Sequence, residues 1–189
     1  PAVVGRLTNN KTPQTHMIRF EHHTQFITIT NLNWLPLLQN DYHKKIILDA
    51  LLNRMTKEQG SIYAFVLMPN HMHFIWQLHD GVIRQDFQRD FLKFTARSIL
   101  NFMRMNDDPL LRQLKVKAPD RKFQIWERNS LSTDIYSEKI LLQKLNYIHA
   151  NPVHPKWKLA DLPENYQYSS ARFYETGVDE FSILTHFRG

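Results

Sequence analysis

The feature that most constrains the fold is a long apolar stretch interrupted once, by Pro69-Asn70. The segments on either side, 62–68 and 71–78, are rich in β-branched and aromatic residues, and Pro-Asn favours a turn between them. We therefore expect an antiparallel β-hairpin. Residues two apart on a strand point to the same face, so His71 and His73 would project together. Two convergent imidazoles can bind a metal, although surface or hydrogen-bonded histidines are the commoner interpretation of His-x-His alone.

Hydrophobic periodicity in the rest of the chain predicts an α+β domain. Apolar residues recur at helical spacing over 41–58, 84–105 and 136–150, whereas 26–30 and 122–127 are typical of strands. The order strand, helix, hairpin, helix, strand and helix favours a ferredoxin-like antiparallel sheet with helices packed on one side. We expect the aromatic-rich C-terminal tail to pack against this sheet.

The composition indicates one domain and restricts its chemistry. With 189 residues, 42% of them hydrophobic, the chain can bury one ordinary core. Residues 1–16 lack apolar periodicity and end next to Met17, so we interpret them as a leader left by cloning and 17–189 as a single domain. The sequence has no cysteine, which leaves nitrogen and oxygen ligands for any metal. No apolar run approaches the roughly 20 residues of a membrane helix, so no membrane partner is expected.

The charge balance makes polyanions plausible partners. Lys plus Arg number 24 and Asp plus Glu number 18, which gives a formal net charge of +6 and a pI near 9.6. Charge alone decides little, because many basic proteins bind no nucleic acid. The outer face of the predicted helix 84–105 is nevertheless strongly basic, and 115–122 is a basic connection interrupted by proline.

A second informative stretch, Asn146-Tyr-Ile-His-Ala-Asn-Pro-Val153, lies far downstream. Tyr147 and Asn151 are four residues apart, so a helix would place the phenol and the amide on one face, one turn apart. Pro152 disfavours helical geometry at Asn151, so the helix is expected to end there. Asn151 is then a simple C-cap, an amide-oxygen ligand of the metal, or both. Tyr147 is either a packed ring with its hydroxyl at the rim or, beside a metal, a participant in phosphoryl transfer.

These two stretches carry a resemblance to a known family. Met68-Pro-Asn-His-Met-His-Phe74, followed by Leu145-Asn-Tyr-Ile-His-Ala-Asn-Pro-Val153, resembles the HUH single-stranded DNA endonucleases that use one catalytic tyrosine. Within these, the chain is most similar to the tyrosine transposases associated with repetitive extragenic palindromes (REP), which are relatives of the small insertion-sequence transposases. The resemblance spans 17–189, includes Tyr166-Gln-Tyr-Ser-Ser-Ala-Arg172 in the tail, and implies the HUH endonuclease fold.

The resemblance also implies a set of site residues. His71 and His73 would be the HUH metal ligands, Tyr147 the nucleophile, and Asn151 the remaining protein ligand, at a position where some relatives carry Gln. Two imidazoles and one amide oxygen leave room for phosphate oxygens, and Mg²⁺ or Mn²⁺ suits this role better than zinc. The product would be a 5′-phosphotyrosine and a free 3′-hydroxyl, which can reverse the step and join strands without ATP.

The expected partner is single-stranded or hairpin DNA. The candidate DNA-binding residues are Arg89, Lys93, Arg97, Lys115, Lys117, Arg121 and Lys122. Trp126 and Trp157 are available for base stacking, although each is individually more often a core residue. We further expect a bacterial-type cytoplasmic protein that associates with the nucleoid and acts as a monomer or a homodimer.

Two other functions stay open from the sequence. A domesticated protein that binds DNA or RNA hairpins without cutting them would keep the basic surface but would not need His71, His73, Tyr147 and Asn151. A metal-dependent hydrolase with water as the nucleophile would leave no covalent adduct and would tolerate Tyr147→Phe.

Overall fold

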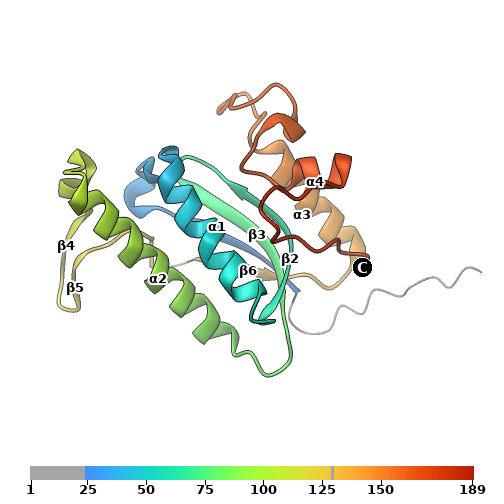
Figure 1. Cartoon of the computed structure of the whole chain (residues 1–189), viewed down its shortest axis with the longest axis horizontal. Helices are drawn as coiled ribbons and strands as arrows, with labels where there is room; N and C mark the ends of the chain where they lie inside the picture. The colour runs from blue at the N-terminus through green and yellow to red at the C-terminus, as the bar shows by residue number, and fades with distance from the viewer. Residues whose placement is uncertain (1–23, 129) are drawn as a thin grey trace, which may run out of the picture.

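The computed structural model describes residues 24–128 and 130–189, and the expected leader at 1–16 lies outside these ranges. Its main sheet has four strands in the order β2-β3-β1-β6 (Figure 1). The strands are β1 Thr24–Thr30, β2 Gly60–Leu67, β3 His71–Leu78, β4 Lys115–Ala118, β5 Arg121–Phe123 and β6 Leu131–Asp134. The α-helices are α1 Asp41–Met55, α2 Arg84–Met105, α3 Glu138–Ala150 and α4 Ala171–Thr176.

The chain order confirms the expected ferredoxin-like arrangement. Two strand-helix-strand halves, β1-α1-β2 and β3-α2-β6, interleave so that β1 and β3 lie in the centre of the sheet. All pairs in this sheet are antiparallel. The turn at Pro69-Asn70 joins β2 to β3, and the register pairs Thr28 with His73. The histidine pair therefore lies on a central strand.

The helices α1 and α2 lie side by side over one face of the sheet (Figure 1). Strand alternation sends Phe74 and Trp76 to this face, where their rings stack at a centroid distance of 5.7 Å and meet Phe91 of α2 edge-on. Thr95 of α2 is buried on this side, whereas its neighbour Phe94 is exposed. Burial of this aromatic layer ties both helices to the sheet.

The opposite face of the sheet carries a second, smaller core formed with α3. Leu141, Leu145 and Ile148 of α3 pack with Val66 and Ile75 of the sheet. His71 and His73 share the face of Ile75, because residues two apart on a strand point the same way. The position of α3 on this face therefore brings the C-terminal turn of that helix toward the histidine pair.

Two features of the sheet differ from the sequence prediction. The expected strand over 122–127 is wrong: β4 and β5 form a separate hairpin that ends at Phe123, and Trp126 makes only an isolated bridge to Asn31. The fourth strand of the main sheet is instead β6, which pairs with β1. Its sequence, Leu-Ser-Thr-Asp, is short and mostly polar, because β6 is an edge strand with exposed residues and shows no apolar alternation.

The aromatic tail packs along β2, as expected. The Tyr166 hydroxyl donates to the Leu67 carbonyl at 2.7 Å, and the Tyr174 hydroxyl donates to the Tyr63 carbonyl at 2.8 Å. Phe187 joins the core beneath α3.

No helix in the described ranges combines the length and the apolar character that crossing a bilayer requires.

Candidate active site

The two histidines of β3 lie against each other in a nearly closed environment. Their ring centroids are 4.8 Å apart, and His71 and His73 are 6% and 3% exposed. Buried polar groups normally have hydrogen-bond partners, so a partner is expected for each ring nitrogen. In both rings Nδ1 has a partner within the protein: Asn70 Oδ1 at 2.7 Å for His71, and Thr28 Oγ1 at 2.9 Å for His73.

The other nitrogen, Nε2, is the group left for a ligand. An amide oxygen only accepts, so His71 Nδ1 carries the proton and its Nε2 carries the lone pair. His73 Nε2 is buried and has no hydrogen-bond partner in the described part of the chain. An unsatisfied buried polar atom lowers the stability of the fold by roughly 1–3 kcal/mol, and a ligand bound to this atom would remove that cost. Metal-binding histidines commonly use one nitrogen for the metal and hydrogen-bond the other.

Electrostatics keep both rings neutral at pH 7. Burial lowers the pKa of His71 to about 4, with Lys156 adding to the effect and a hydrogen bond to the Asn151 amide oxygen opposing it. Burial lowers the pKa of His73 to about 3, helped by His71 and by Lys144. A neutral imidazole is the form that binds metals, because its lone pair is free.

Tyr147 lies beside His73 in the last turn of α3. Its side chain is 51% exposed, so a substrate can reach the phenol. The ring centroids of Tyr147 and His73 are 5.2 Å apart, and Phe26 lies 5.2 Å from His73 and 5.9 Å from Tyr147. Phe26 therefore holds the tyrosine ring against the imidazole on the sheet face.

Asn151 occupies the C-cap of α3 and is buried. Its Nδ2 donates to the Tyr147 carbonyl at 3.1 Å, which leaves the amide oxygen for the site. A hydrogen bond to the Asn151 amide raises the pKa of His71, so Asn151 lies beside the His71 ring. Within 24–128 and 130–189, no three His, Cys, Asp or Glu side chains lie close enough together to share a metal ion. At this site the side chain next to the histidine pair is instead the Asn151 amide.

The donor set suits a divalent cation that accepts both nitrogen and oxygen ligands. Two neutral imidazole nitrogens and one amide oxygen would hold it, and the unpartnered His73 Nε2 is the atom that argues most directly for such a ligand. The ligand roles of His71, His73 and Asn151 and the nucleophile role of Tyr147 stay predictions, which the geometry permits.

Several site residues were not identified from the sequence. Two lysines stand at the rim: Lys144 Nζ lies 4.6 Å from the Phe26 ring centroid, and Lys156 Nζ lies 5.0 Å from that of Trp157. Neither lysine forms an ion pair with another described residue. Lys144 precedes Tyr147 by three residues, which is one helical turn, so helical spacing could have identified it. Thr28 could be found only through the β1–β3 register.

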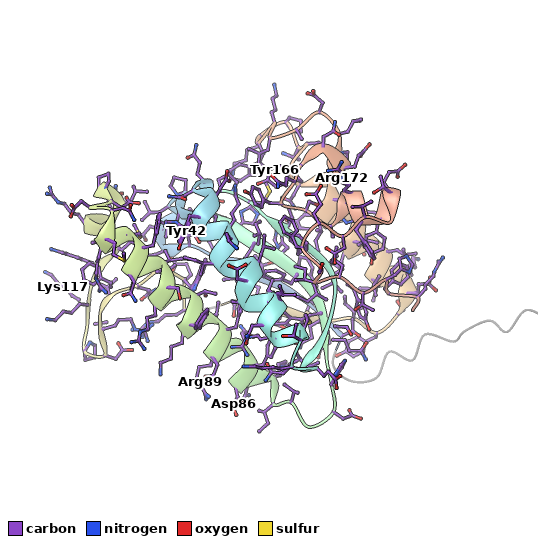
Figure 2. All side chains as sticks on the ribbon, viewed as in Figure 1. Tyr42, Asp86, Arg89, Lys117, Tyr166 and Arg172 are labelled. Carbon is purple, nitrogen blue, oxygen red and sulfur yellow. The ribbon has the colours of Figure 1, made fainter. Side chains whose placement is uncertain are left out.

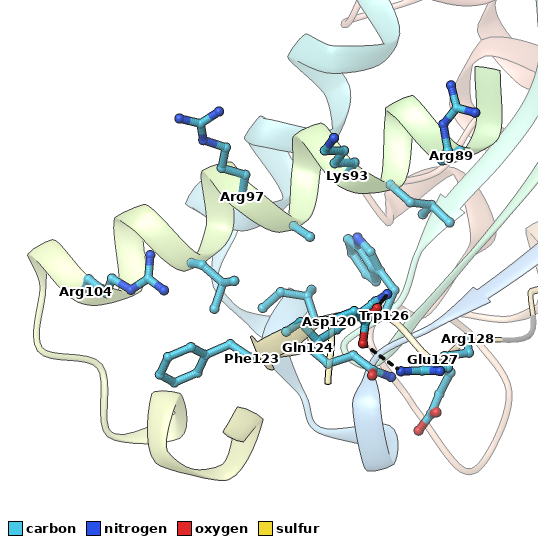
Figure 3. Close-up of a pocket in the computed structure, with 15 residues that line it drawn as sticks. Arg89, Lys93, Arg97, Arg104, Asp120, Phe123, Gln124, Trp126, Glu127 and Arg128 are labelled. Atoms are coloured by element: carbon cyan, nitrogen blue, oxygen red, sulfur yellow. Dashed lines mark hydrogen bonds and ion pairs between the residues drawn. The ribbon is translucent and has the colours of Figure 1, made fainter. Parts of the chain in front are cut away.

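The candidate DNA-binding residues divide into two groups. A groove of about 560 Å³ runs between α2 and the segment 120–128, and Arg89, Lys93, Arg97 and Arg121 line it. In Figure 3 the basic side chains follow one another along α2, with Phe123 and Asp120 across from them. The other three residues, Lys115, Lys117 and Lys122, are exposed on the β4–β5 hairpin but do not line the groove, and Lys117 marks the outer edge of the molecule (Figure 2).

Charges in this groove are only partly compensated. Arg89 pairs with Asp86 and Asp90, and Arg121 and Arg128 share Asp120. Arg104, which also lines the groove, lies over the Phe123 ring at 5.2 Å. Lys93 and Arg97 make no ion pair within the described ranges. These two cations are the most available for an anionic partner.

The two tryptophans named for stacking have different surroundings. Trp126 is buried, and its Nε1 donates to Thr95 Oγ1 at 3.2 Å, so the core interpretation is confirmed. Trp157 is partly buried and lies 5.7 Å from the His71 ring.

Three buried histidines make the metal-free protein sensitive to acid. Burial lowers the pKa of His149 to about 4, near the value for His71, and that of His73 to about 3. The unfolded chain binds these protons near pH 6.5, so below that pH it takes up more protons than the folded protein and stability falls. We expect each histidine to cost roughly 1–2 kcal/mol by pH 5. Melting temperatures in EDTA at pH 7, 6 and 5 would show the decline, and His149→Gln should flatten it relative to His154→Gln, a change at an exposed site. A melting temperature constant over this range would contradict the prediction.

Fold and site together define a ferredoxin-like α+β domain with a histidine pair on a central strand and a tyrosine on a helix beside it. No protein-family model and no curated protein matches the sequence. Among solved structures, the chain is similar to a REP-associated tyrosine transposase bound to a REP hairpin, with a TM-score of 0.59, 20% identity and 87% of each chain covered. The expected resemblance is thereby confirmed at the level of the fold. A protein from Deinococcus radiodurans with the provisional description of a transposase has a TM-score of 0.43 and 18% identity, over 67% of this chain and 89% of that one.

Proposed function

We propose that the protein is a metal-dependent endonuclease and strand transferase that cleaves single-stranded DNA near a hairpin through a covalent bond to Tyr147. The observation that carries the proposal is the accessible phenol, whose ring lies 5.2 Å from a buried imidazole with an unpartnered nitrogen. A tyrosine packed for stability alone would not need a nearly inaccessible histidine pair beside it.

The residues of the site would have different roles in the reaction. His71, His73 and Asn151 would hold Mg²⁺ or Mn²⁺, which when bound polarises the scissile phosphate and stabilises its developing charge. Lys144, whose charge acts on His73, and Lys156, whose charge acts on His71, would bind phosphate oxygens of the strand. Asn151 also donates to the Tyr147 carbonyl, so one residue fixes the end of the helix that carries the nucleophile.

The chemical step is a transesterification at phosphorus. The Tyr147 phenol loses its proton to solvent, and its oxygen forms a bond to phosphorus. The bond from phosphorus to the 3′ oxygen breaks, and that oxygen takes up a proton to become a free 3′-hydroxyl. The other strand fragment stays attached through a 5′-phosphotyrosine bond, which keeps the phosphodiester energy for rejoining. Reversal by another 3′-hydroxyl would transfer the strand.

The basic groove along α2 would hold the DNA stem. Phosphate contacts position nucleic acids without reading their sequence, and the available cations Lys93 and Arg97 suit that role. The fold of the REP-associated transposase supports a hairpin as the partner. Cytoplasmic location, association with the nucleoid and the choice between monomer and homodimer belong to the same proposal.

Removing the groove charges should weaken hairpin binding in a salt-dependent way. For the double variant Lys93→Gln, Arg97→Gln we expect the negative slope of log K against log salt to become shallower by about 1.8, because each lost phosphate contact removes about 0.9 from its magnitude. A fluorescence anisotropy titration at several salt concentrations would measure this slope. The matched control, Lys45→Gln with Lys57→Gln, removes the same charge from α1 and the turn after it. Equal slopes for the two double variants would mean that the DNA stem does not bind in the groove along α2.

The test of the proposed function is a search for the covalent product. Hairpin-bearing single-stranded oligonucleotides with randomised flanks are incubated with the protein and Mn²⁺, then run on a denaturing protein gel. We expect a shifted, nuclease-sensitive band that EDTA abolishes. Tight hairpin binding without such a band would favour the non-cutting binder, and cleaved DNA without the band would favour a hydrolase that activates water.

A further inference from the structure

An exposed tryptophan stands at the mouth of the site and has no assigned role. Trp34 ends the short 3-10 turn Leu32–Trp34 that follows β1, and its side chain is 58% exposed. Its ring centroid lies 5.9 Å from that of His71, with the planes at 65°. Leaving a large aromatic ring in water forgoes the free energy of burying it, so this placement is costly unless something covers the ring.

The backbone beneath the ring is also unfavourable. Asn33 and Trp34 have φ values of 52° and 57°, in the left-handed region that bulky residues rarely adopt. Such a conformation is unfavourable for tryptophan and persists only where its surroundings hold it.

Three hydrogen bonds to two distant segments, the turn at Asn70 and the loop 125–127, hold this turn in place. Asn31 N donates to the Asn70 carbonyl at 2.9 Å, and Leu32 N donates to the Ile125 carbonyl at 2.7 Å. Asn33 N donates to Glu127 Oε1 at 2.7 Å. Asn70 also accepts from His71, so one residue connects the turn to the histidine pair. The fold thus fixes Trp34 relative to His71 while leaving its face open.

Two tryptophan rings and one lysine lie around His71. The ring centroids of Trp157 and His71 are 5.7 Å apart with the planes tilted at 47°, and Lys156 lies over Trp157. Glu127, which accepts from Asn33, also lines the basic groove along α2, so the turn stands between the groove and the site. Rings and cations along one path are the pattern that binds single-stranded nucleic acid, where bases stack and phosphates pair with charge.

We propose that Trp34 is a stacking platform for an unpaired DNA base next to the phosphate that Tyr147 attacks. The inference rests on the proposed function for the identity of the strand. Bases in a duplex already stack on their neighbours, so only an unpaired base can present a free face to the indole. The platform would therefore select single-stranded flanks over the paired stem and would fix the strand beside His71.

The test compares two DNA ligands in EDTA, so that binding is measured without cleavage. One is a hairpin with unpaired nucleotides on both sides of its stem, and the other is the same stem with blunt ends. For Trp34→Ala we expect the dissociation constant for the flanked hairpin to rise about tenfold, within the roughly 5- to 150-fold that one stacked base contributes. Binding of the blunt stem should change less than twofold. Trp34→Phe should retain most of the flank preference, and Tyr42→Ala, which removes a similarly exposed ring from α1, should retain all of it.

The outcomes separate this inference from the proposed function. A ratio of blunt to flanked dissociation constants in Trp34→Ala equal to that of the wild type overturns the platform, whether or not the covalent band forms. An equal loss of both ligands also overturns it. A Trp34-dependent flank preference in a protein that forms no covalent band supports the platform and refutes the nuclease. Equal melting temperatures of wild type and Trp34→Phe would show that the fold is intact.

Discussion

Replacing Tyr147 by Phe should abolish the covalent product and leave DNA binding unchanged. The substitution removes the attacking oxygen and nothing else, so no bond to phosphorus can form and strand cleavage should fall by at least about 10³-fold. Half of the ring is exposed, and Phe keeps its contacts with Phe26 and His73. We expect a change in stability within about 0.5 kcal/mol, as for most surface changes. Single-turnover cleavage of a labelled oligonucleotide and anisotropy binding would be measured on the same samples.

The control for this variant is Tyr42→Phe. Tyr42 is also 51% exposed but lies on α1, where its ring stacks on Phe102 at 4.1 Å. The control should cut at the wild-type rate. Cleavage by Tyr147→Phe at that same rate would remove Tyr147 from the nucleophile role and favour water or another tyrosine.

The second large effect is expected at His73. Replacing it by Ala removes a proposed ligand, so Mn²⁺-dependent cleavage should drop by about 100-fold or more. The same change should abolish stabilisation by the metal, because a ligand that binds only the folded state raises its stability. At 100 times the dissociation constant that stabilisation is about 2.7 kcal/mol, which corresponds to several degrees in melting temperature. Thermal melts with and without Mn²⁺ would measure it independently of catalysis.

His43 offers a closely matched control. It is as buried as His73, its Nδ1 has a protein partner in the Leu37 carbonyl at 2.7 Å, and its Nε2 is likewise unpartnered within the described chain. It lies on α1, where its aromatic neighbour is Phe102 and not a second imidazole. His43→Ala should therefore lose stability to a similar extent but keep both the Mn²⁺ shift and cleavage. Equal Mn²⁺ shifts in the two variants would refute the metal site at the histidine pair.

Local patterns predicted the elements whose signals are long and periodic. The helix expected over 84–105 has those bounds in the structure, because its apolar stripe spans the whole element. The hairpin across Pro69-Asn70 was equally accessible, since a turn signal separates two apolar runs. The strand β6 could not be found this way, because its pairing with β1 depends on the three-dimensional fold and leaves no apolar pattern in four mostly polar residues.

The site was predictable only in parts. Spacing alone places His71 beside His73 and Tyr147 one turn from Asn151, but it does not bring the two pairs together. Their meeting depends on α3 packing on the sheet face that carries Ile75, and the family resemblance alone suggested it. Trp34 could not be found from spacing, because its exposure results from a turn held by distant segments.

The most direct test of the central claim is to locate the attachment point of the DNA by mass spectrometry. After reaction with a hairpin oligonucleotide and Mn²⁺, nuclease trimming and trypsin release the peptide 145–156, whose single tyrosine is Tyr147. The proposed function predicts this peptide with a nucleotide attached through its 5′ phosphate to that phenol. A nucleotide on any other residue, or cleaved DNA with the peptide unmodified, would contradict it.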